Sequence, residues 1–447
     1  MNNVKVAAAV AIALGGGLAG QSAFALTAAQ CTVAPVKLYV AGSSAAQPSF
    51  ATALAADLFD TTNGETTFSA PAVANVANGN FKAYCGTAKA GNGAHLATGT
   101  VVLVHYRGEG GSVVGALPVV SNKPVKFLDL SATSCQTGTA PSVTGLSANV
   151  GTTDGWTGCV TTHAVEMGVT DLEPGVFIGQ NYPVNYSTTV FGTATPAQLG
   201  NLTTTPLFQQ VFGLFINTNG LSGGGVAQAV DLSRETVANI LAGNISDWSQ
   251  VPTVTGGHVS TTSPAPITLV NREAGSGTRS GASIYFLETN CSANGVGSGV
   301  LSDPNPTLDG FATGDVLNTV SATPGGITYA SIDNNNGTHP NLTLASLSGV
   351  APSNLAATSG SYDWWFEATA VQGAPSTSGA AVYNWLIGGE LANVATAPHV
   401  KDILAIPNNG TNVATVPVVA STVGGTTIYI NPFTRGGNSC QAPGAAF

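Results

Sequence analysis

The sequence predicts a mixed α/β protein with two lobes, and three observations support this prediction. The chain has 447 residues, more than one ordinary hydrophobic core accommodates, so two lobes are the expected organisation. Short apolar runs rich in β-branched residues end in loops of glycine and serine, as buried strands do. Segments with helical spacing follow some of these loops, and this alternation indicates a parallel or mixed sheet covered by helices.

Four apolar runs are the predicted strands, and three segments are the predicted helices. The first helix begins near Pro48, a residue type that suits the first turn. Another helix, over 233–242, has Ser233 as its N-cap and Gly243 as its stop signal. The predicted strands are 37–41, 101–106, 164–169 and 267–270, and the remaining helix covers 282–289 after a glycine-rich loop.

The first 25 residues predict export. Lys5 precedes an apolar run from Val6 to Leu18, and residues 23–25 (Ala-Phe-Ala) form a small-x-small cleavage pattern, so residues 1–25 resemble a secretory signal peptide. The apolar run is too short and too rich in glycine for a membrane span. We therefore expect a mature chain without a membrane span, located in the periplasm or outside the cell.

All six cysteines follow the predicted signal peptide, and an even number in this context predicts up to three disulfides. Only the pair Cys135–Cys159 is specifically predicted, because a short polar loop joins these two residues, and the other pairings stay open. No Cys-x-x-Cys or His-x-x-x-His spacing occurs in the sequence. No metal site is therefore expected, and no cofactor is indicated.

The charge composition disfavours two classes of protein. Charged residues make up 8% of the chain, against roughly a quarter in ordinary globular proteins, and the formal net charge is −10. Nucleic-acid binding needs a basic stripe and is disfavoured. Disorder is disfavoured as well, because 43% hydrophobic content can support a core. Three of the five arginines, Arg107, Arg272 and Arg279, lie in loops rich in glycine and serine.

Two loops have the features of an anion-binding site. A loop between a strand end and a helix start presents free backbone N–H groups at the positive end of the helix dipole. Residues 271–279 (NREAGSGTR) add glycines, hydroxyls and an arginine near each end, and Gly42-Ser43-Ser44 precedes the first predicted helix. The ordinary alternatives are a capping loop for Gly-Ser-Ser and a cap or turn role for Asp171. The lack of a Gly-Lys-Ser/Thr ending disfavours a nucleotide-binding P-loop.

Several segments resemble, in their residues and in their order along the chain, the PstS-like phosphate-binding proteins of ABC importers. These proteins are a branch of the type 2 periplasmic binding proteins. The most specific segment is Arg-x-x-Gly-Ser-Gly-Thr at 272–278, supported by Thr-Pro-Gly-Gly-Ile-x-Tyr at 323–329. The resemblance implies a type 2 periplasmic-binding-protein fold, in which two α/β lobes close through a hinge on a ligand in the cleft between them. The other similar segments are 40–48, 106–112, 167–174, 206–217 and 232–248, and the similarity around 272–278 extends over 267–279.

The same resemblance implies a binding site for inorganic phosphate or a similar oxyanion. Asp171 matches the family aspartate that accepts a proton from monohydrogen phosphate, and Arg272 matches the arginine that supplies the guanidinium. A buried carboxylate repels a fully ionised oxyanion such as sulfate, so Asp171 is the residue expected to favour phosphate. The other implied ligands donate hydroxyl, N–H or guanidinium groups: Ser43, Ser44, Gly111, Ser112, Ser276, Gly277, Thr278 and, as in one branch of the family, Arg279.

The expected function is capture of phosphate for ABC-type uptake, with an ABC permease among the implied partners and a monomeric protein. Lobe 1 is expected to comprise 26–218 and 331–447, and lobe 2 to comprise 219–330, with a hinge near 212–217 and again after Tyr329. The alternative is a secreted PstS-like protein with a structural, adhesive or phosphate-scavenging role and no transporter. We expect no enzymatic activity, because the sequence has no Gly-x-Ser-x-Gly elbow and no cluster of metal ligands.

Overall fold

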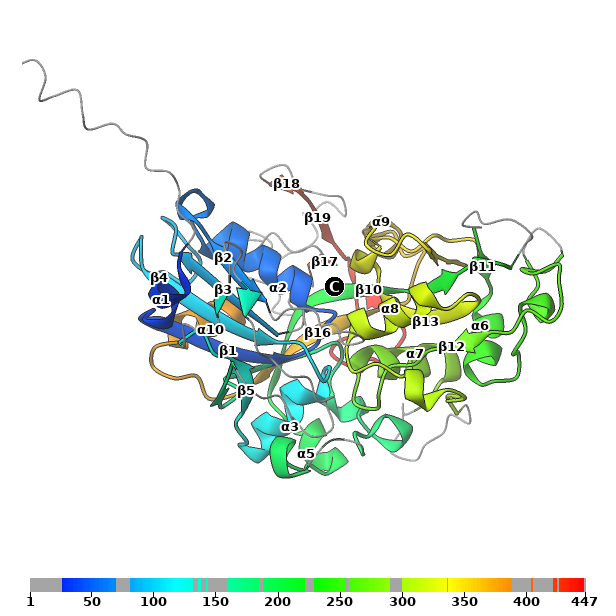
Figure 1. Cartoon of the computed structure of the whole chain (residues 1–447), viewed down its shortest axis with the longest axis horizontal. Coiled ribbons are helices and arrows are strands. Elements are labelled where there is room, and N and C mark those ends of the chain that lie inside the picture. The colour runs from blue at the N-terminus through cyan, green and yellow to red at the C-terminus, as the bar shows by residue number, and fades with distance from the viewer. Residues whose placement is uncertain are drawn as a thin grey trace, which may run out of the picture.

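The computed structural model confirms the predicted mixed α/β class (Figure 1). The predicted signal peptide, residues 1–25, lies outside the described residues. Among the residues that are described, no helix is both long and apolar enough to cross a membrane. The structure describes residues 26–69, 81–131, 136–137, 142–143, 159–184, 186, 188–221, 229–253, 257–289, 300–335, 337–387, 403–404, 421–423 and 426–445.

One mixed sheet of fifteen strands runs through the described part of the molecule. Three of its neighbouring strands are parallel: β9 (Met167–Thr170), β1 (Val36–Gly42) and β4 (Val101–Arg107). Their carboxyl ends therefore meet at one edge of the sheet, and each strand is followed by a loop that contains predicted site residues. Other strands of this sheet are β2 Thr66–Ser69, β3 Phe81–Thr87, β6 Gln136–Thr137, β7 Ser142–Val143, β12 Thr268–Leu269, β18 Ser421–Val423 and β19 Thr426–Ile430. Three separate two-stranded sheets in the described residues pair β5 Val125–Leu128 with β8 Val160–His163, β11 Asp231–Leu232 with β15 Ser346–Leu347, and β20 Phe433–Thr434 with β21 Gly444–Ala445.

Two predicted strands differ in extent from the observed ones. The apolar run 164–169 forms a strand only from Met167, and the run 267–270 is reduced to β12. In the first case the Glu166 carboxylate accepts the N–H of Tyr39 at 3.0 Å, a bond that a strand carbonyl would otherwise accept. The predicted strands 37–41 and 101–106 are confirmed as β1 and β4.

A long strand, β10 (Thr204–Asn217), is shared by two groups of strands. Its first part pairs with β16 (Trp365–Gln372) and β17 (Ile403–Leu404), whereas its last part pairs with β13 (Gly326–Ser331) and β14 (Leu342–Leu344). In Figure 1 the strands β1 to β4 lie on the left and β11 to β13 on the right, with β16 and β17 near the centre. The predicted lobe boundaries and hinge stay predictions.

Two of the three predicted helices begin where the local sequence signals indicate, whereas the third, predicted over 282–289, begins five residues earlier because Ser276 is its N-cap. In α6 (Arg234–Leu241) the Ser233 hydroxyl accepts the N–H of Thr236, and Gly243 has a φ of 78°, as a stop signal requires. The helix near Pro48 is α2 (Gln47–Ala53), which continues into a π-helical turn over Leu54–Leu58. The other helices are α1 Ala28–Thr32, α3 Val113–Ser121, α4 Thr188–Phe191, α5 Pro196–Gly200, α7 Gly277–Leu287, α8 Thr313–Ala322, α9 Asn354–Thr358 and α10 Ala380–Ile387.

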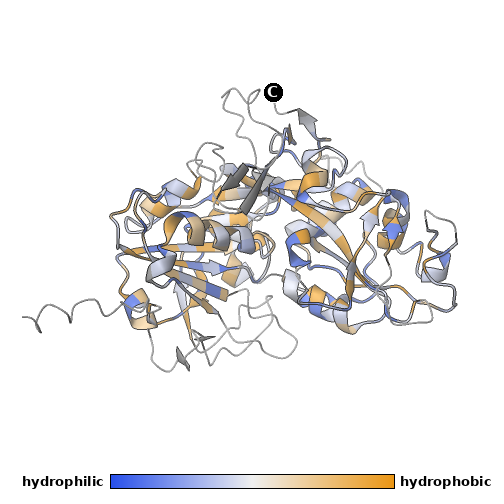
Figure 2. Ribbon diagram, turned by 90° about the horizontal axis from the view of Figure 1, so that it is seen from above, coloured by the Kyte–Doolittle hydropathy of each residue, from blue (hydrophilic) through white to orange (hydrophobic). Residues whose placement is uncertain are grey.

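The hydrophobic core lies between the sheet and its covering helices. Figure 2 shows the hydrophobic residues concentrated on the strands and on the helices that cover them. One large cluster joins residues of α3, α6, α7, β10 and β13, and a second joins α2 with β1, β4 and β16. The helices α2, α3 and α7, which follow loops with predicted site residues, pack into these two clusters. This packing holds the ends of the loops in place.

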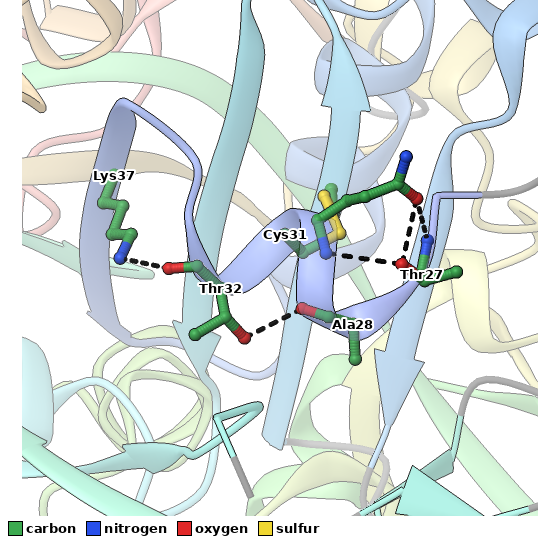
Figure 3. Close-up of a disulfide and its surroundings, with 7 residues drawn as sticks. Thr27, Ala28, Cys31, Thr32 and Lys37 are labelled. Carbon is green, nitrogen blue, oxygen red and sulfur yellow. Dashed lines mark hydrogen bonds between the residues drawn. A yellow bond between two sulfur atoms is a disulfide. The ribbon is translucent and has the colours of Figure 1, made fainter. Parts of the chain in front are cut away.

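A disulfide between Cys31 and Cys85 fastens α1 to β3 (Figure 3). The short helix α1 is also closed by a capping box, in which Thr27 accepts from Gln30 N and the Gln30 side chain accepts from Thr27 N. This pairing is one that the sequence left open. Cys159 is disulfide-bonded too, but its predicted partner Cys135 lies outside the described residues, so the predicted pair stays a prediction.

Candidate anion-binding site

The starts of three helices lie in contact with one another next to the carboxyl ends of β1, β4 and β9. Val113, the first residue of α3, donates its N–H to the carbonyl of Gly275 in the loop before α7. The start of α8 also contacts the loop before α7, because the hydroxyl of Thr313, its first residue, accepts from the Arg272 guanidinium at 3.1 Å. The first N–H groups of a helix have no partner within it, so three positive helix ends converge on one small volume.

Asp171 follows β9 directly and is the centre of this site. Its carboxylate accepts hydrogen bonds from the Ser43 hydroxyl and, at 2.9 Å, from the Thr278 hydroxyl. Its backbone N–H donates to the Ser112 hydroxyl at 3.1 Å. The Asp171 side chain is 2% exposed, so one buried carboxylate joins the loops after β1, β4 and β9 to the start of α7.

Arg272 is the buried cation of the site and is 1% exposed. Its Nη1 donates to the hydroxyls of Thr278 at 3.5 Å and Thr313 at 3.1 Å. Its Nε and Nη2 donate to the carbonyls of Gly310 and Phe311 at 3.3 and 3.1 Å. All of these acceptors are neutral. The Thr278 hydroxyl accepts from the guanidinium and donates to Asp171, so it bridges the two charged groups.

Burial disturbs the protonation of both charged groups. It raises the pKa of Asp171 above 3.8, although hydrogen bonds from Ser43 and Thr278 and the charge of Arg272 oppose this shift. Burial also lowers the pKa of Arg272, although the charge of Asp171 opposes that shift. Each charged group is therefore less well solvated inside the protein than it would be in water.

Two glycines permit the close approach of the three loops. A Cβ atom added to Gly277 would lie 2.6 Å from the Ser112 hydroxyl oxygen and 2.7 Å from Asp171 Cβ. Gly111 has a φ of 70°, and a Cβ there would lie 3.4 Å from Arg272 Nη2. Glycine is needed at 277 for space and at 111 for conformation.

Most of the predicted site residues lie together. The structure brings Ser43, Ser112, Asp171, Arg272 and Thr278 into one hydrogen-bonded group, each 2% exposed or less. Gly111 and Gly277 pack against members of this group, and Ser44 joins it through Thr313. Their role as ligands stays a prediction.

Ser276 and Arg279 have structural partners that the sequence did not indicate. The Ser276 hydroxyl is the N-cap of α7 and accepts the N–H of Arg279 at 3.3 Å. The Arg279 side chain donates to the Arg272 carbonyl at 2.7 Å and lies 3.5 Å from the Asp309 carboxylate. Burial raises the pKa of Asp309 to about 7, although Arg279 opposes the shift. Arg279 thus supports the loop that carries Arg272.

Sequence reasoning missed one side chain, Thr313. It is 3% exposed and contacts both Ser44 and Arg272. A threonine at a helix start followed two residues later by Asp315 is a weak local signal, because the same pattern occurs at ordinary helix starts. In the described part of the chain, no group of three or more His, Cys, Asp or Glu side chains could hold a metal ion.

Comparison with known proteins supports the predicted resemblance over part of the chain. Residues 194–380 match the family model of a PBP superfamily domain. This range contains the Arg272–Arg279 loop, α7 and α8, whereas Ser43 and Asp171 precede it. A search among curated proteins found no match.

Several solved structures are similar to this chain at low sequence identity. One is assigned as a phosphate ABC transporter substrate-binding protein from Clostridium perfringens, with 16% identity over 80% of this chain and 96% of that one, and a TM-score of 0.41. Another is a phosphate-binding protein from Stenotrophomonas maltophilia, with 14% identity over 88% of this chain and 86% of that one, and a TM-score of 0.41.

Proposed function

We propose that this protein is an exported solute-binding protein that captures inorganic phosphate for ABC-type uptake. The observation that carries the proposal is the arrangement of Asp171 and Arg272, two buried charged groups bridged by the Thr278 hydroxyl, at the point where three helices begin. The ligands are the predicted ones: Ser43, Ser44, Gly111, Ser112, Asp171, Arg272, Ser276, Gly277 and Thr278, with Arg279 behind Arg272.

The chemistry of the site favours a small anion. An anion brought to Arg272 supplies a negative charge beside this buried guanidinium, and the N–H groups of Gly277 and Thr278 at the start of α7 add donors without adding net positive charge. This explains how a chain with a net charge of −10 binds an anion, since the attraction is local.

Asp171 selects for an anion that still carries a proton. A hydroxyl of monohydrogen or dihydrogen phosphate donates to the Asp171 carboxylate, and the Ser43 and Thr278 hydroxyls rotate to donate to the other phosphate oxygens. Sulfate has no proton at neutral pH, so its oxygens would face an unpaired buried acceptor. Such mispairing costs about 1–3 kcal/mol, and more for a charged group, which is about tenfold or greater discrimination.

Ligand capture proceeds by closure of the two predicted lobes. Ser43 follows β1, which lies on the left in Figure 1, and Asp171 follows β9, which pairs with β1; Arg272 lies between β12 and α7, which are on the right. An anion that contacts both groups only when they are together favours the closed arrangement by its binding free energy. A binding protein that acts in this way needs no catalytic group.

Titration calorimetry of the mature, ligand-stripped protein tests this function. Phosphate is expected to bind tightly, and excess sulfate is expected not to compete. In the Asp171→Asn variant the preference for phosphate over sulfate is expected to fall by about tenfold or more, because an amide can donate to sulfate. Absence of heat with phosphate, in protein shown to be folded and phosphate-free, would contradict the function.

A further inference from the structure

One hydrogen-bonded contact joins the loop after β1 directly to the start of α8. The Thr313 N–H donates to the Ser44 hydroxyl oxygen at 3.1 Å, and the two hydroxyl oxygens lie 3.0 Å apart. Ser44 is 7% exposed and Thr313 is 3% exposed, so water does not compete freely for these bonds. In Figure 1 the two segments belong to the left and right groups of elements, with α2 and α8 facing each other near the centre.

Thr313 also contacts the buried cation of the site. Arg272 Nη1 donates to the Thr313 hydroxyl at 3.1 Å, while Phe311 and Gly310 accept from Nη2 and Nε. A guanidinium has no acceptor, so the Thr313 oxygen must accept in this pair and its own proton is left for another partner. The nearest hydroxyl partner that the structure gives is Ser44.

This direction of donation leaves the Ser44 proton free. In this arrangement the Ser44 oxygen accepts both the N–H and the hydroxyl proton of Thr313. The Ser44 O–H itself is then available to donate to a ligand. That donor is the one that the proposed function assigns to the anion. Thr313 therefore orients Ser44 from one side and Arg272 from the other.

We infer that Thr313 is a closure residue of the anion site, which ties Ser44 to Arg272 across the two groups of elements and slows release of the bound anion. This inference rests on the proposed function and adds a residue to it. Thr313 is a positioning residue, since its measured contacts are with Ser44 and Arg272.

Loss of the Thr313 hydroxyl should leave α8 intact. The start of this helix is closed by Asp315, whose carboxylate accepts the N–H of Ala312 at 2.9 Å. Valine has nearly the shape of threonine without its hydroxyl, so Thr313→Val removes two hydrogen bonds at little change in packing volume. Thr319→Val is the matched control, because Thr319 lies on the same helix and its hydroxyl donates only to the Asp315 carbonyl at 2.9 Å.

The test measures the release of radiolabelled phosphate into an excess of unlabelled phosphate, together with the dissociation constant from calorimetry. Thr313→Val is expected to release phosphate about tenfold faster than the unmodified protein, because a hydrogen bond to a charged group is lost. The association rate, obtained from the two measurements, is expected to change by less than about twofold. Thr313→Ser is expected to restore slow release, and Thr319→Val to release phosphate at the unmodified rate.

A second variant keeps the test decisive if Thr313→Val folds poorly. Ser44→Ala breaks the same contact from the other side and is expected to release phosphate about tenfold faster or more. Where Thr313→Val does fold, the double variant Ser44→Ala/Thr313→Val should release phosphate more slowly than two independent effects would predict. Unmodified protein that binds phosphate, with Thr313→Val releasing it at the same rate, would overturn this inference alone. Unmodified, folded protein that binds no phosphate would overturn the proposed function and the inference with it.

Discussion

Two buried clusters of charge lie next to the glycine loop after β4, and they are built differently. In one, Arg107 and Glu109 form an ion pair at 2.8 Å, with side chains that are 0% and 4% exposed. In the other, no ion pair within 4 Å joins Asp171 and Arg272, both of which the structure describes, and the Thr278 hydroxyl lies between them. In the first cluster the two opposite charges are in direct contact, whereas in the second they are not. We call the first cluster closed and the second open.

The completed pair is stabilised by its surroundings as well. The Arg107 guanidinium lies over the rings of Phe81 and Phe191, 5.0 and 5.4 Å from their centroids, and its Nη1 donates to the Lys126 carbonyl. Tyr186 donates to the Gly110 carbonyl next to it. This cluster anchors the glycine loop, and it has no charge left to offer a ligand.

The open arrangement has a cost that a ligand can offset. A buried charge without a close counter-charge is unfavourable by several kcal/mol, and such groups persist where a site needs them. Under the proposed function, an anion that carries one proton would satisfy both groups. The comparison separates a closed pair, in which opposite charges are in contact, from an open one, in which the Thr278 hydroxyl lies between them.

The largest expected effect comes from removing the cation of the open cluster. Arg272→Met should weaken phosphate binding by about 100-fold or more, because two or more charge-assisted hydrogen bonds are lost. The double variant Arg107→Met/Glu109→Gln removes the closed pair together and should retain the affinity within about threefold, since neither charge is left unpaired. Calorimetry with phosphate measures both, and circular dichroism checks that each variant is folded. Equal losses in the two variants would remove the distinction between the clusters.

A smaller effect is expected from filling the space between the loops of the open cluster. In Gly277→Ala the added methyl group would lie within 2.9 Å of Ser112 and Asp171 atoms, so the loop must shift away from the carboxylate. Forced overpacking costs about 1–3 kcal/mol, and we expect about tenfold weaker phosphate binding. Gly200→Ala in α5 is the control, because its nearest neighbour would be at an ordinary 3.9 Å. Gly277→Ala protein with unmodified affinity would show that this approach is not needed.

The sequence predicted the parts of the site that depend on local pattern. A strand end, a glycine and a hydroxyl before a helix are all neighbours in sequence, and so the loops with Ser43, Arg272 and Thr278 could be predicted from local pattern. The resemblance to a family added Ser112 and Asp171, and the single acidic side chain of Asp171 carries no local signal.

The parts that escaped prediction depend on contacts between distant segments. Thr313 contacts Ser44 across 269 residues of chain, and nothing in either segment indicates the other. The ligand role predicted for Arg279 stays a prediction, but neither segment indicates its contact with the Asp309 carboxylate, 30 residues later in the chain, at 3.5 Å. The Cys31–Cys85 bond is another case, since only the packing of α1 on β3 distinguishes it from other pairings.

The smallest expected effect is a pH dependence of stability that belongs to the open cluster. Burial raises the pKa of Asp171 above 3.8, so the folded protein holds this proton more tightly than the unfolded chain does. Between the unfolded and folded pKa values, folding takes up a proton, and the free energy of unfolding therefore falls as pH rises through this interval. Asp171→Asn has no such proton. The free energy of unfolding of Asp171→Asn minus that of the unmodified protein should thus increase as pH rises from about 4.

Urea unfolding of both proteins without phosphate, at several pH values between about 4 and 8, measures this difference. Asp309 and Glu173, whose pKa values burial also raises, are present in both proteins, so their contributions cancel. Added phosphate should reverse the trend for the unmodified protein, because a protonated oxyanion stabilises the carboxylate that burial disfavours. A difference that is flat or falls as pH rises would mean that Asp171 is as well compensated as the Arg107–Glu109 pair, and the cluster would then be closed rather than open.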